Sequence, residues 1–310
     1  MSVKTVVAAL SAFIFLIVVA TAGAAPRGVD VKDVAKTRAE VRAHWTAERM
    51  REAVPVTPEA EGEQVAPNDT TAEPPPADTD LAPAAPAPTS FPFSSGEYQG
   101  DYPGTYGRVF FTDDGIDYVC SGTAINSQNR SVVWTAGHCV NDGPGAFHTN
   151  WMFIPAYRDG VRPYGTWTAR ELLTTNGWGQ RGDISYDLGA AVMSTSGGVA
   201  LNDAVGGLGI AFDAPREQTY TAFGYPAAPP FTGERLRTCT SAYGASDPGT
   251  VPSTMAIGCD MTGGASGGGW VVGNAVHSVV SYGYGDQPNV IYGPYQSTEA
   301  RALFDAAAAR

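Results

Sequence analysis

TGGASGGGW, residues 262–270, places a single serine among five glycines. Glycine lacks a Cβ, so it allows tight turns and lets neighbouring backbone N–H groups approach one oxygen atom closely. The amides of Gly264 and Ser266 are the two donors that we expect to face such an oxygen. A glycine-rich loop is more often only a turn. The stretch predicts a nucleophilic serine only if the chain also supplies a base.

A serine hydroxyl becomes an effective nucleophile when a histidine removes its proton and a carboxylate orients that histidine. The chain has four histidines. His138 lies in WTAGHC (134–139), where it follows an apolar run and precedes Cys139. A zinc site is disfavoured, because two cysteines and one histidine make an incomplete ligand set. On these residues alone, a structural role for His138 remains as plausible as a catalytic one.

The orienting carboxylate is expected in GDISYDLGAAVM (182–193). Asp187 leads directly into the apolar run 188–193, which can form an interior strand, whereas Asp183 is soon followed by a serine. We therefore prefer Asp187 to Asp183, with a turn-capping role as the alternative for either.

From Tyr98 onward, short apolar runs alternate with clusters of Gly, Asn, Asp and Pro. Runs of this length and density predict an antiparallel sandwich or barrel, and the Ala-rich tail 297–310 predicts a closing helix. The four cysteines lie in this part of the chain. An even number in an exported chain indicates two disulfides, although three pairings are possible.

The chain before this region divides into three segments. Residues 1–24 have the order of a secretory signal peptide, with an uncleaved anchor over 6–20 as the alternative. Residues 25–53 place apolar residues at near-helical spacing and predict a short helix. Residues 54–97 are rich in Pro, Ala and acidic residues and predict a disordered linker, which would leave that helix tethered rather than embedded.

The formal net charge of −12 argues against a nucleic-acid binder or a binder of anionic membranes, since both partners are negatively charged. We expect protein or peptide partners, no nucleic acid, and no stable membrane association once the signal is cleaved.

The order His, Asp, Ser excludes an α/β-hydrolase, in which the acid and the histidine follow the serine. Here the chain resembles the chymotrypsin-like (trypsin superfamily) serine proteases, and it looks nearer to their bacterial glutamyl endopeptidase-like branch. The matching stretches are CSGTAI (120–125), TAGHC (135–139), YDLGAAV (186–192), GGASGGG (263–269) and VVSYG (279–283).

The resemblance implies an all-β protein of two six-stranded antiparallel β-barrels with a C-terminal helix, spanning residues 98–310. It makes His138 the general base, Asp187 its partner and Ser266 the nucleophile. It also implies two disulfides, Cys120–Cys139 and Cys239–Cys259.

Two departures from the family pattern affect activation and specificity. Ala265 replaces the Asp that pairs with a freed N-terminal amine in the animal enzymes, so any latency must come from the chain before Tyr98. Glutamyl endopeptidases have a histidine that receives the substrate carboxylate where this chain has Val280, so a preference for Glu is not expected unless the nearby His277 takes that role. Asp260 lies six positions before Ser266, as the pocket acid of trypsin does, and would favour basic substrates. The predicted specificity pocket comprises Asp260, Val280, Ser281 and Tyr282.

The sequence thus predicts a secreted, monomeric serine endopeptidase that needs no metal or organic cofactor. One alternative is a catalytically silent binding or adhesion protein that keeps the protease fold. The other is an active enzyme anchored by its N-terminal apolar run.

Overall fold

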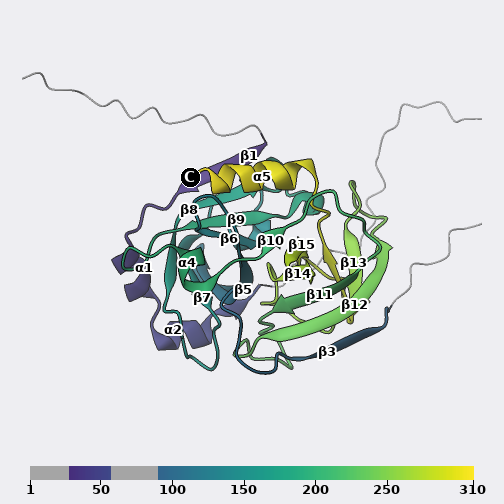
Figure 1. Cartoon of the computed structure of the whole chain (residues 1–310), viewed down its shortest axis with the longest axis horizontal. Helices are drawn as coiled ribbons and strands as arrows, with labels where there is room; N and C mark the ends of the chain where they lie inside the picture. Colours follow the sequence, from purple (N-terminus) through teal and green to yellow (C-terminus); the bar gives the residue numbers. More distant parts are fainter. Residues whose placement is uncertain (1–27, 57–89) are drawn as a thin grey trace, which may run out of the picture.

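The first sheet of the molecule closes into a barrel (Figure 1). The computed structural model describes residues 28–56 and 90–310, so the predicted signal peptide and most of the predicted linker lie outside the described residues. The barrel strands pair in the order β8-β7-β4-β5-β6-β9, and β9 pairs back with β8. They are β4 (Tyr106–Asp113), β5 (Ile116–Ile125), β6 (Val132–Thr135), β7 (Thr149–Pro155), β8 (Trp167–Thr175) and β9 (Gly189–Met193).

The hairpin between β4 and β5 shows how local sequence sets the register of this barrel. Asp114 and Gly115 connect the two strands and both have positive φ angles, 42° and 82°. Asp-Gly in this geometry is the two-residue turn that matches the twist of paired strands. It sets the full register from Tyr106 opposite Thr123 to Asp113 opposite Ile116.

The second half of the chain forms another antiparallel sheet, in the order β15-β14-β11-β12-β13-β16. A bridge between Tyr282 and Tyr292 joins the chain after β15 to β16, and two outer strands, β3 and β10, pair with β12 and β15. These strands are β3 (Phe93–Glu97), β10 (Gly209–Ile210), β11 (Thr219–Gly224), β12 (Arg237–Ser246), β13 (Met255–Gly258), β14 (Gly269–Val272), β15 (Ala275–Val279) and β16 (Val290–Gly293). With the C-terminal helix, the predicted all-β fold class is confirmed.

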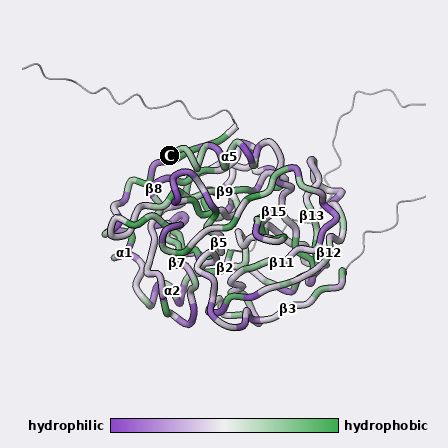
Figure 2. Tube along the Cα trace, viewed as in Figure 1, coloured by the Kyte–Doolittle hydropathy of each residue, from purple (hydrophilic) through white to green (hydrophobic). Residues whose placement is uncertain are grey.

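The helices are short except at the C-terminus. Helix α5 (Thr298–Ala308) lies in the predicted Ala-rich tail and packs on β8 and β9, and its Leu303 and Ala307 are fully buried. Between the strands lie α3 (Asn176–Arg181) and α4 (Leu201–Val205), with 3-10 turns at Gly137–Cys139 and Ile184–Tyr186. Hydrophobic positions recur along the strands of both sheets (Figure 2). None of the helices in residues 28–56 and 90–310 combines the length and apolar character needed to cross a membrane.

The segment expected to be one helix within residues 25–53 is instead, over its described part, a strand followed by two short helices. These elements are β1 (Val29–Asp33), α1 (Arg38–His44), α2 (Ala47–Glu52) and a two-residue strand β2 (Val54–Pro55). The hydroxyls of Thr37 and Thr46 cap the helices, and Glu40 completes a capping box with Thr37. Two caps start two helices where apolar spacing alone suggested one.

The expectation that this segment is tethered rather than embedded is also wrong. β1 pairs antiparallel with β8, and β2 pairs parallel with β5. Val41, Trp45 and Met50 are each at most 3% exposed, and the Trp45 indole packs on Phe110. The apolar face of the segment is buried against the first barrel, since leaving it in water would cost the free energy of apolar exposure.

Candidate active site

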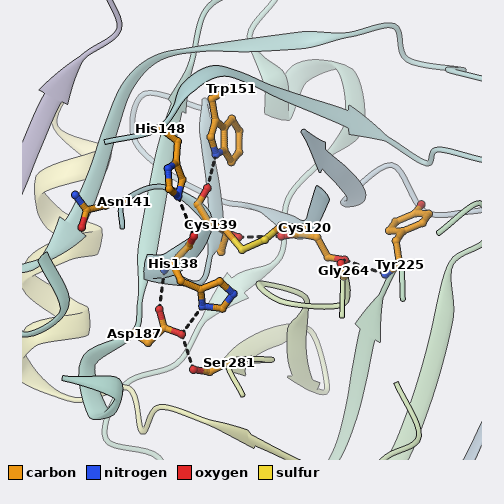
Figure 3. Close-up of a disulfide and its surroundings, with 12 residues drawn as sticks. Cys120, His138, Cys139, Asn141, His148, Trp151, Asp187, Tyr225, Gly264 and Ser281 are labelled. Carbon is orange, nitrogen blue, oxygen red and sulfur yellow. Dashed lines mark hydrogen bonds and ion pairs between the residues drawn. A yellow bond between two sulfur atoms is a disulfide. The ribbon is translucent and has the colours of Figure 1, made fainter. Parts of the chain in front are cut away.

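The short turn after β6 carries His138. The chain leaves β6 at Thr135 and forms a 3-10 turn over Gly137–Cys139. A disulfide joins Cys139 to Cys120 on β5 (Figure 3). The second disulfide joins Cys239 to Cys259. The turn is therefore covalently attached to the neighbouring strand, which limits the movement of the imidazole.

Asp187 receives three hydrogen bonds at the end of the 3-10 turn that precedes β9 (Figure 3). The His138 Nδ1–H donates to Oδ2 over 2.7 Å, and the His138 backbone N–H donates to Oδ1 over 2.8 Å. The Ser281 hydroxyl donates to Oδ2 over 2.5 Å. This buried carboxylate fixes both the tautomer and the orientation of the imidazole. Asp183 instead accepts the Ser185 amide at 3.1 Å and caps the turn.

The other ring nitrogen of His138, Nε2, is buried and has no hydrogen-bond partner among the described residues. Ser281 bonds to the carboxylate behind the imidazole and also lines a cavity of about 380 Å³ that Ser266 lines as well. Ser266 is 3% exposed. His138 is linked to this cavity through Asp187 and Ser281 and has one ring nitrogen without a partner in the described part of the chain, which a base needs if it is to accept a proton from a nucleophile.

Hydrogen bonds to β5 and β15 hold the loop around Ser266. The Ser121 amide donates to the Ser266 carbonyl at 2.7 Å, and the Ser121 hydroxyl donates to the Gly264 carbonyl at 2.8 Å. The amide of Gly267 donates to the Val280 carbonyl at 2.7 Å. Ala265 is fully buried, and Gly224 lies so close that a Cβ there would come within 3.0 Å of its side chain. The loop thus keeps its shape without an acid at position 265.

The two amides predicted to bind an oxyanion differ in their surroundings. The Gly264 N–H donates to the carbonyl oxygen of Val56 at 2.9 Å. Within the described residues, the Ser266 N–H makes no hydrogen bond. The Gly264 N–H is therefore occupied by Val56, whereas the Ser266 N–H has no acceptor in the part of the chain that the structure describes.

The predicted pocket residues divide into two groups. Val280, Ser281 and Tyr282 line the cavity that Ser266 also lines. The carboxylate of Asp260 instead accepts the Ser95 hydroxyl of β3 at 2.8 Å, and Asp260 is not among the cavity residues. His277 also lies outside this lining, with its ring edge toward Tyr220. Neither Asp260 nor His277 lines the cavity.

Tyr282, which was predicted to lie in the pocket, and Tyr284 line the cavity and share a buried acid, Asp247, that the sequence did not indicate. The hydroxyls of Tyr282 and Tyr284 both donate to the carboxylate of Asp247, the latter over 2.8 Å. Burial, and secondly the nearby Asp247, raise the pKa of both tyrosines well above the ordinary value. Burial likewise raises the pKa of Tyr292 to about 12. With their pKa raised, these phenols stay protonated at neutral pH. Their sequence signal was only a high density of tyrosine.

Three ring N–H groups that the sequence analysis did not single out hold the carbonyls of the His138 loop. The His148 Nε2–H donates to the His138 carbonyl at 3.0 Å, and the Trp151 indole donates to the Cys139 carbonyl at 2.8 Å (Figure 3). The Trp178 indole donates to the Asn141 carbonyl at 3.0 Å. Their apolar neighbours predicted burial, but not these partners.

The residues present do not favour a metal ion at this site. Cys120, His138 and Cys139 lie within 4.8 Å of one another. However, the two sulfurs are joined in a disulfide, so neither can act as a thiolate ligand.

The chain is similar in sequence and fold to several known proteases. The protease Anisep from Arthrobacter nicotinovorans is 44% identical, with 70% of this chain covering all of that one at a TM-score of 0.67. A thermostable serine protease, AL20, from an extremophilic microorganism is also 44% identical, with 67% and 98% coverage and a TM-score of 0.64. A Glu endopeptidase shares the fold, at 18% identity over 70% of this chain and 97% of that one, with a TM-score of 0.57.

An extracellular metalloprotease from Bacillus subtilis is 31% identical over 81 residues, which are 26% of this chain. The match spans about a quarter of that relative, 25% of its length. A family model described as trypsin matches residues 100–300, about two thirds of the chain. The chain therefore belongs to the trypsin family of peptide hydrolases.

Proposed function

We propose that this protein is a secreted serine endopeptidase that hydrolyses peptide bonds through an acyl-enzyme on Ser266. The observation that carries the proposal is the buried His138–Asp187 pair, whose imidazole has one nitrogen bonded to the carboxylate and the other unoccupied. Neutral imidazole in this tautomer accepts a proton at Nε2.

The reaction follows from these positions. Nε2 of His138 takes the proton of the Ser266 hydroxyl as the oxygen attacks the substrate carbonyl carbon. The tetrahedral intermediate carries its negative charge toward the amides of Gly264 and Ser266 once both are free. His138 then gives the proton to the leaving amine, and the peptide bond breaks. Water, deprotonated by the same imidazole, hydrolyses the acyl-enzyme and restores Ser266.

Ser266→Ala tests the role of the nucleophile. We expect casein hydrolysis and fluorophosphonate labelling both to vanish, while the far-ultraviolet circular dichroism spectrum stays unchanged. Ser246→Ala, at an exposed serine on β12, is the matched control and should behave as the wild type. If the wild type and Ser266→Ala both bind substrate and neither hydrolyses it, the catalytically silent binding protein would be favoured instead.

We further propose that the cavity selects an uncharged, apolar side chain immediately before the scissile bond. Met261, Val280 and Ile291 lie in its wall, and none of its lining residues is charged. A buried carboxylate or guanidinium in this cavity would lose hydration without a charged partner, which is costly.

Cleavage-site profiling on a peptide library tests this preference. We expect large apolar residues before the cut, and the same profile for Asp260→Asn, because that carboxylate faces Ser95 rather than the cavity. A preference for Arg or Lys that Asp260→Asn abolishes would contradict the assignment, and so would a preference for Glu.

Export is proposed from the N-terminal sequence. The Bacillus subtilis relative is an extracellular protease, which agrees with this proposal. N-terminal sequencing of protein from the culture medium tests it. A start after residue 24 supports a cleaved signal, whereas intact chain in the membrane fraction would indicate the anchored alternative.

A further inference from the structure

Residues 28–56, here called the N-terminal segment, bind the first barrel along one continuous path. The segment begins as an added strand: β1 pairs with β8 from Val29 opposite Thr175 to Asp33 opposite Glu171. It continues across β7, where the Trp45 indole donates to the Asn150 carbonyl at 2.6 Å. Strand pairing supplies affinity, and the buried indole anchors the segment.

A polar cluster fastens the second half of the segment to β5. Asp117 accepts the His44 Nε2 at 2.8 Å and the Arg49 guanidinium at 2.9 Å. The Asp117 side chain is 12% exposed, so the interaction is partly shielded from solvent. His44 and Arg49 lie shortly before β2, so their contacts with Asp117 limit the position of the end of the segment.

The segment ends on the predicted oxyanion site. The Val56 N–H donates to the Val119 carbonyl at 3.3 Å, and the Val56 carbonyl accepts the Gly264 N–H at 2.9 Å. A substrate carbonyl needs that same N–H when negative charge develops on its oxygen. While Val56 holds it, the reaction has only the Ser266 amide to stabilise the intermediate.

The contact is not that of a substrate about to be cut after Val56. In the described residues the Ser266 amide does not donate to the Val56 carbonyl, and Val56 is not among the residues that line the cavity beside Ser266. A scissile carbonyl would receive both amides and would place its side chain in that cavity. The segment therefore obstructs the site without being positioned for hydrolysis.

Two further observations agree with a removable inhibitor. Ala265 cannot form the ion pair with a new N-terminus that orders the animal enzymes, and the loop is already held by Ser121. The similar protease of Arthrobacter nicotinovorans is covered completely by 70% of this chain, and the trypsin-family match begins at residue 100. The trypsin-family match thus does not include the N-terminal segment.

We propose that the N-terminal segment is an intramolecular inhibitor that holds the Gly264 N–H through the Val56 carbonyl, and that its release activates the protein. This inference rests on the proposed endopeptidase function. Loss of one oxyanion donor lowers kcat by about 100- to 1,000-fold, which sets the size of activation expected on release.

The test uses intact full-length chains, verified by mass spectrometry, and measures the rate of fluorophosphonate labelling at Ser266. His44→Ala combined with Arg49→Ala removes both partners of Asp117, and Trp45→Ala removes the buried anchor. Glu48→Ala, at an exposed position on α2 next to Arg49, is the matched control. Hydrogen–deuterium exchange at Gly264 reports directly on its N–H.

We expect both releasing variants to label at least about tenfold faster than the wild type and Glu48→Ala, since partial release recovers part of the oxyanion effect. Exchange at Gly264 should accelerate in the same variants. If Trp45→Ala unfolds, the double variant decides. Equal labelling rates in all four folded chains would overturn the inhibitor and leave the endopeptidase standing. Absence of labelling in every folded chain, with fast exchange at Gly264, would overturn the proposed function instead.

Discussion

At the residue scale, Ser121 holds the loop around Ser266, which has no acid at position 265 to hold it. Its hydroxyl accepts the Tyr225 N–H at 2.8 Å and donates to the Gly264 carbonyl at the same distance. Its own amide holds the Ser266 carbonyl. Because Ser121 follows the disulfide-bonded Cys120, the loop that carries Ser266 is attached to the same strand as the loop that carries His138.

Ser121→Ala should therefore lower both activity and stability. It leaves a buried N–H and a buried carbonyl without partners, at a cost of about 1–3 kcal/mol in the free energy of unfolding. Urea denaturation and kcat on a peptide substrate measure the two effects. Thr123→Val on the same strand is the control, since the Thr123 hydroxyl has no hydrogen-bond partner among the described residues. Equal losses in the two variants would contradict this role for Ser121.

His148 gives a pH-dependent prediction. Burial lowers its pKa below 6.5, against the opposing effects of the His138 carbonyl, Asp113 and Asp142. As pH falls below 6.5, the unfolded chain takes up the proton before the folded chain does, so the free energy of unfolding decreases. His148→Gln removes this contribution. We expect its stability to change less than that of the wild type between about pH 7.5 and pH 5.5. Denaturant titration at the two pH values measures it, and parallel losses would contradict it.

At the scale of elements, the sequence predicted those strands whose formation depends on residues close together in the chain. The apolar run before His138 and the run after Asp187 are the adjacent strands β6 and β9, so both patterns placed their polar ends at the same edge. The side-chain direction of Asp260 could not be predicted, because it depends on β3 pairing with β12 from far along the chain. The sequence predicted a tethered helix for the N-terminal segment for the same reason: β1 pairs with β8, which lies far along the chain.

The Cys120–Cys139 disulfide joins β5 to the turn that carries His138. Replacing both cysteines by alanine should reduce the free energy of unfolding by about 2–5 kcal/mol. Activity should fall more steeply than the folded fraction, because the freed turn no longer fixes the imidazole. Thermal unfolding and kcat measured on the same samples separate the two effects. Retained kcat in a destabilised protein would show that hydrogen bonds alone position the turn.

At the scale of the whole molecule, a charged contact links the two halves. Arg108 on β4 donates to Glu234, which precedes β12, over 2.8 Å, and Tyr157 donates to the same carboxylate. The Arg108 side chain is 3% exposed, whereas Glu234 is 28% exposed. This pairing joins residues 126 positions apart, and no local pattern in the sequence indicates it.

Glu234→Gln should destabilise the protein by about 3 kcal/mol, because it leaves the buried Arg108 charge without its partner. Asp203→Asn breaks the exposed pair with Arg130 and is the matched control, with an expected cost below about 1 kcal/mol. Urea denaturation compares the two. A similar small cost in both variants would mean that solvent, rather than Glu234, compensates Arg108.

Ala265 has a practical consequence for how the protein can be made and handled. Since the active loop requires no ion pair with a terminal ammonium group, its geometry is independent of the chemical form of the first residue. Acetylated, carbamylated or affinity-tagged forms of the processed chain should hydrolyse peptides as fast as the unmodified one. Trimming by exopeptidases should likewise leave turnover unchanged, so a heterogeneous population of N-termini would still behave as one enzyme.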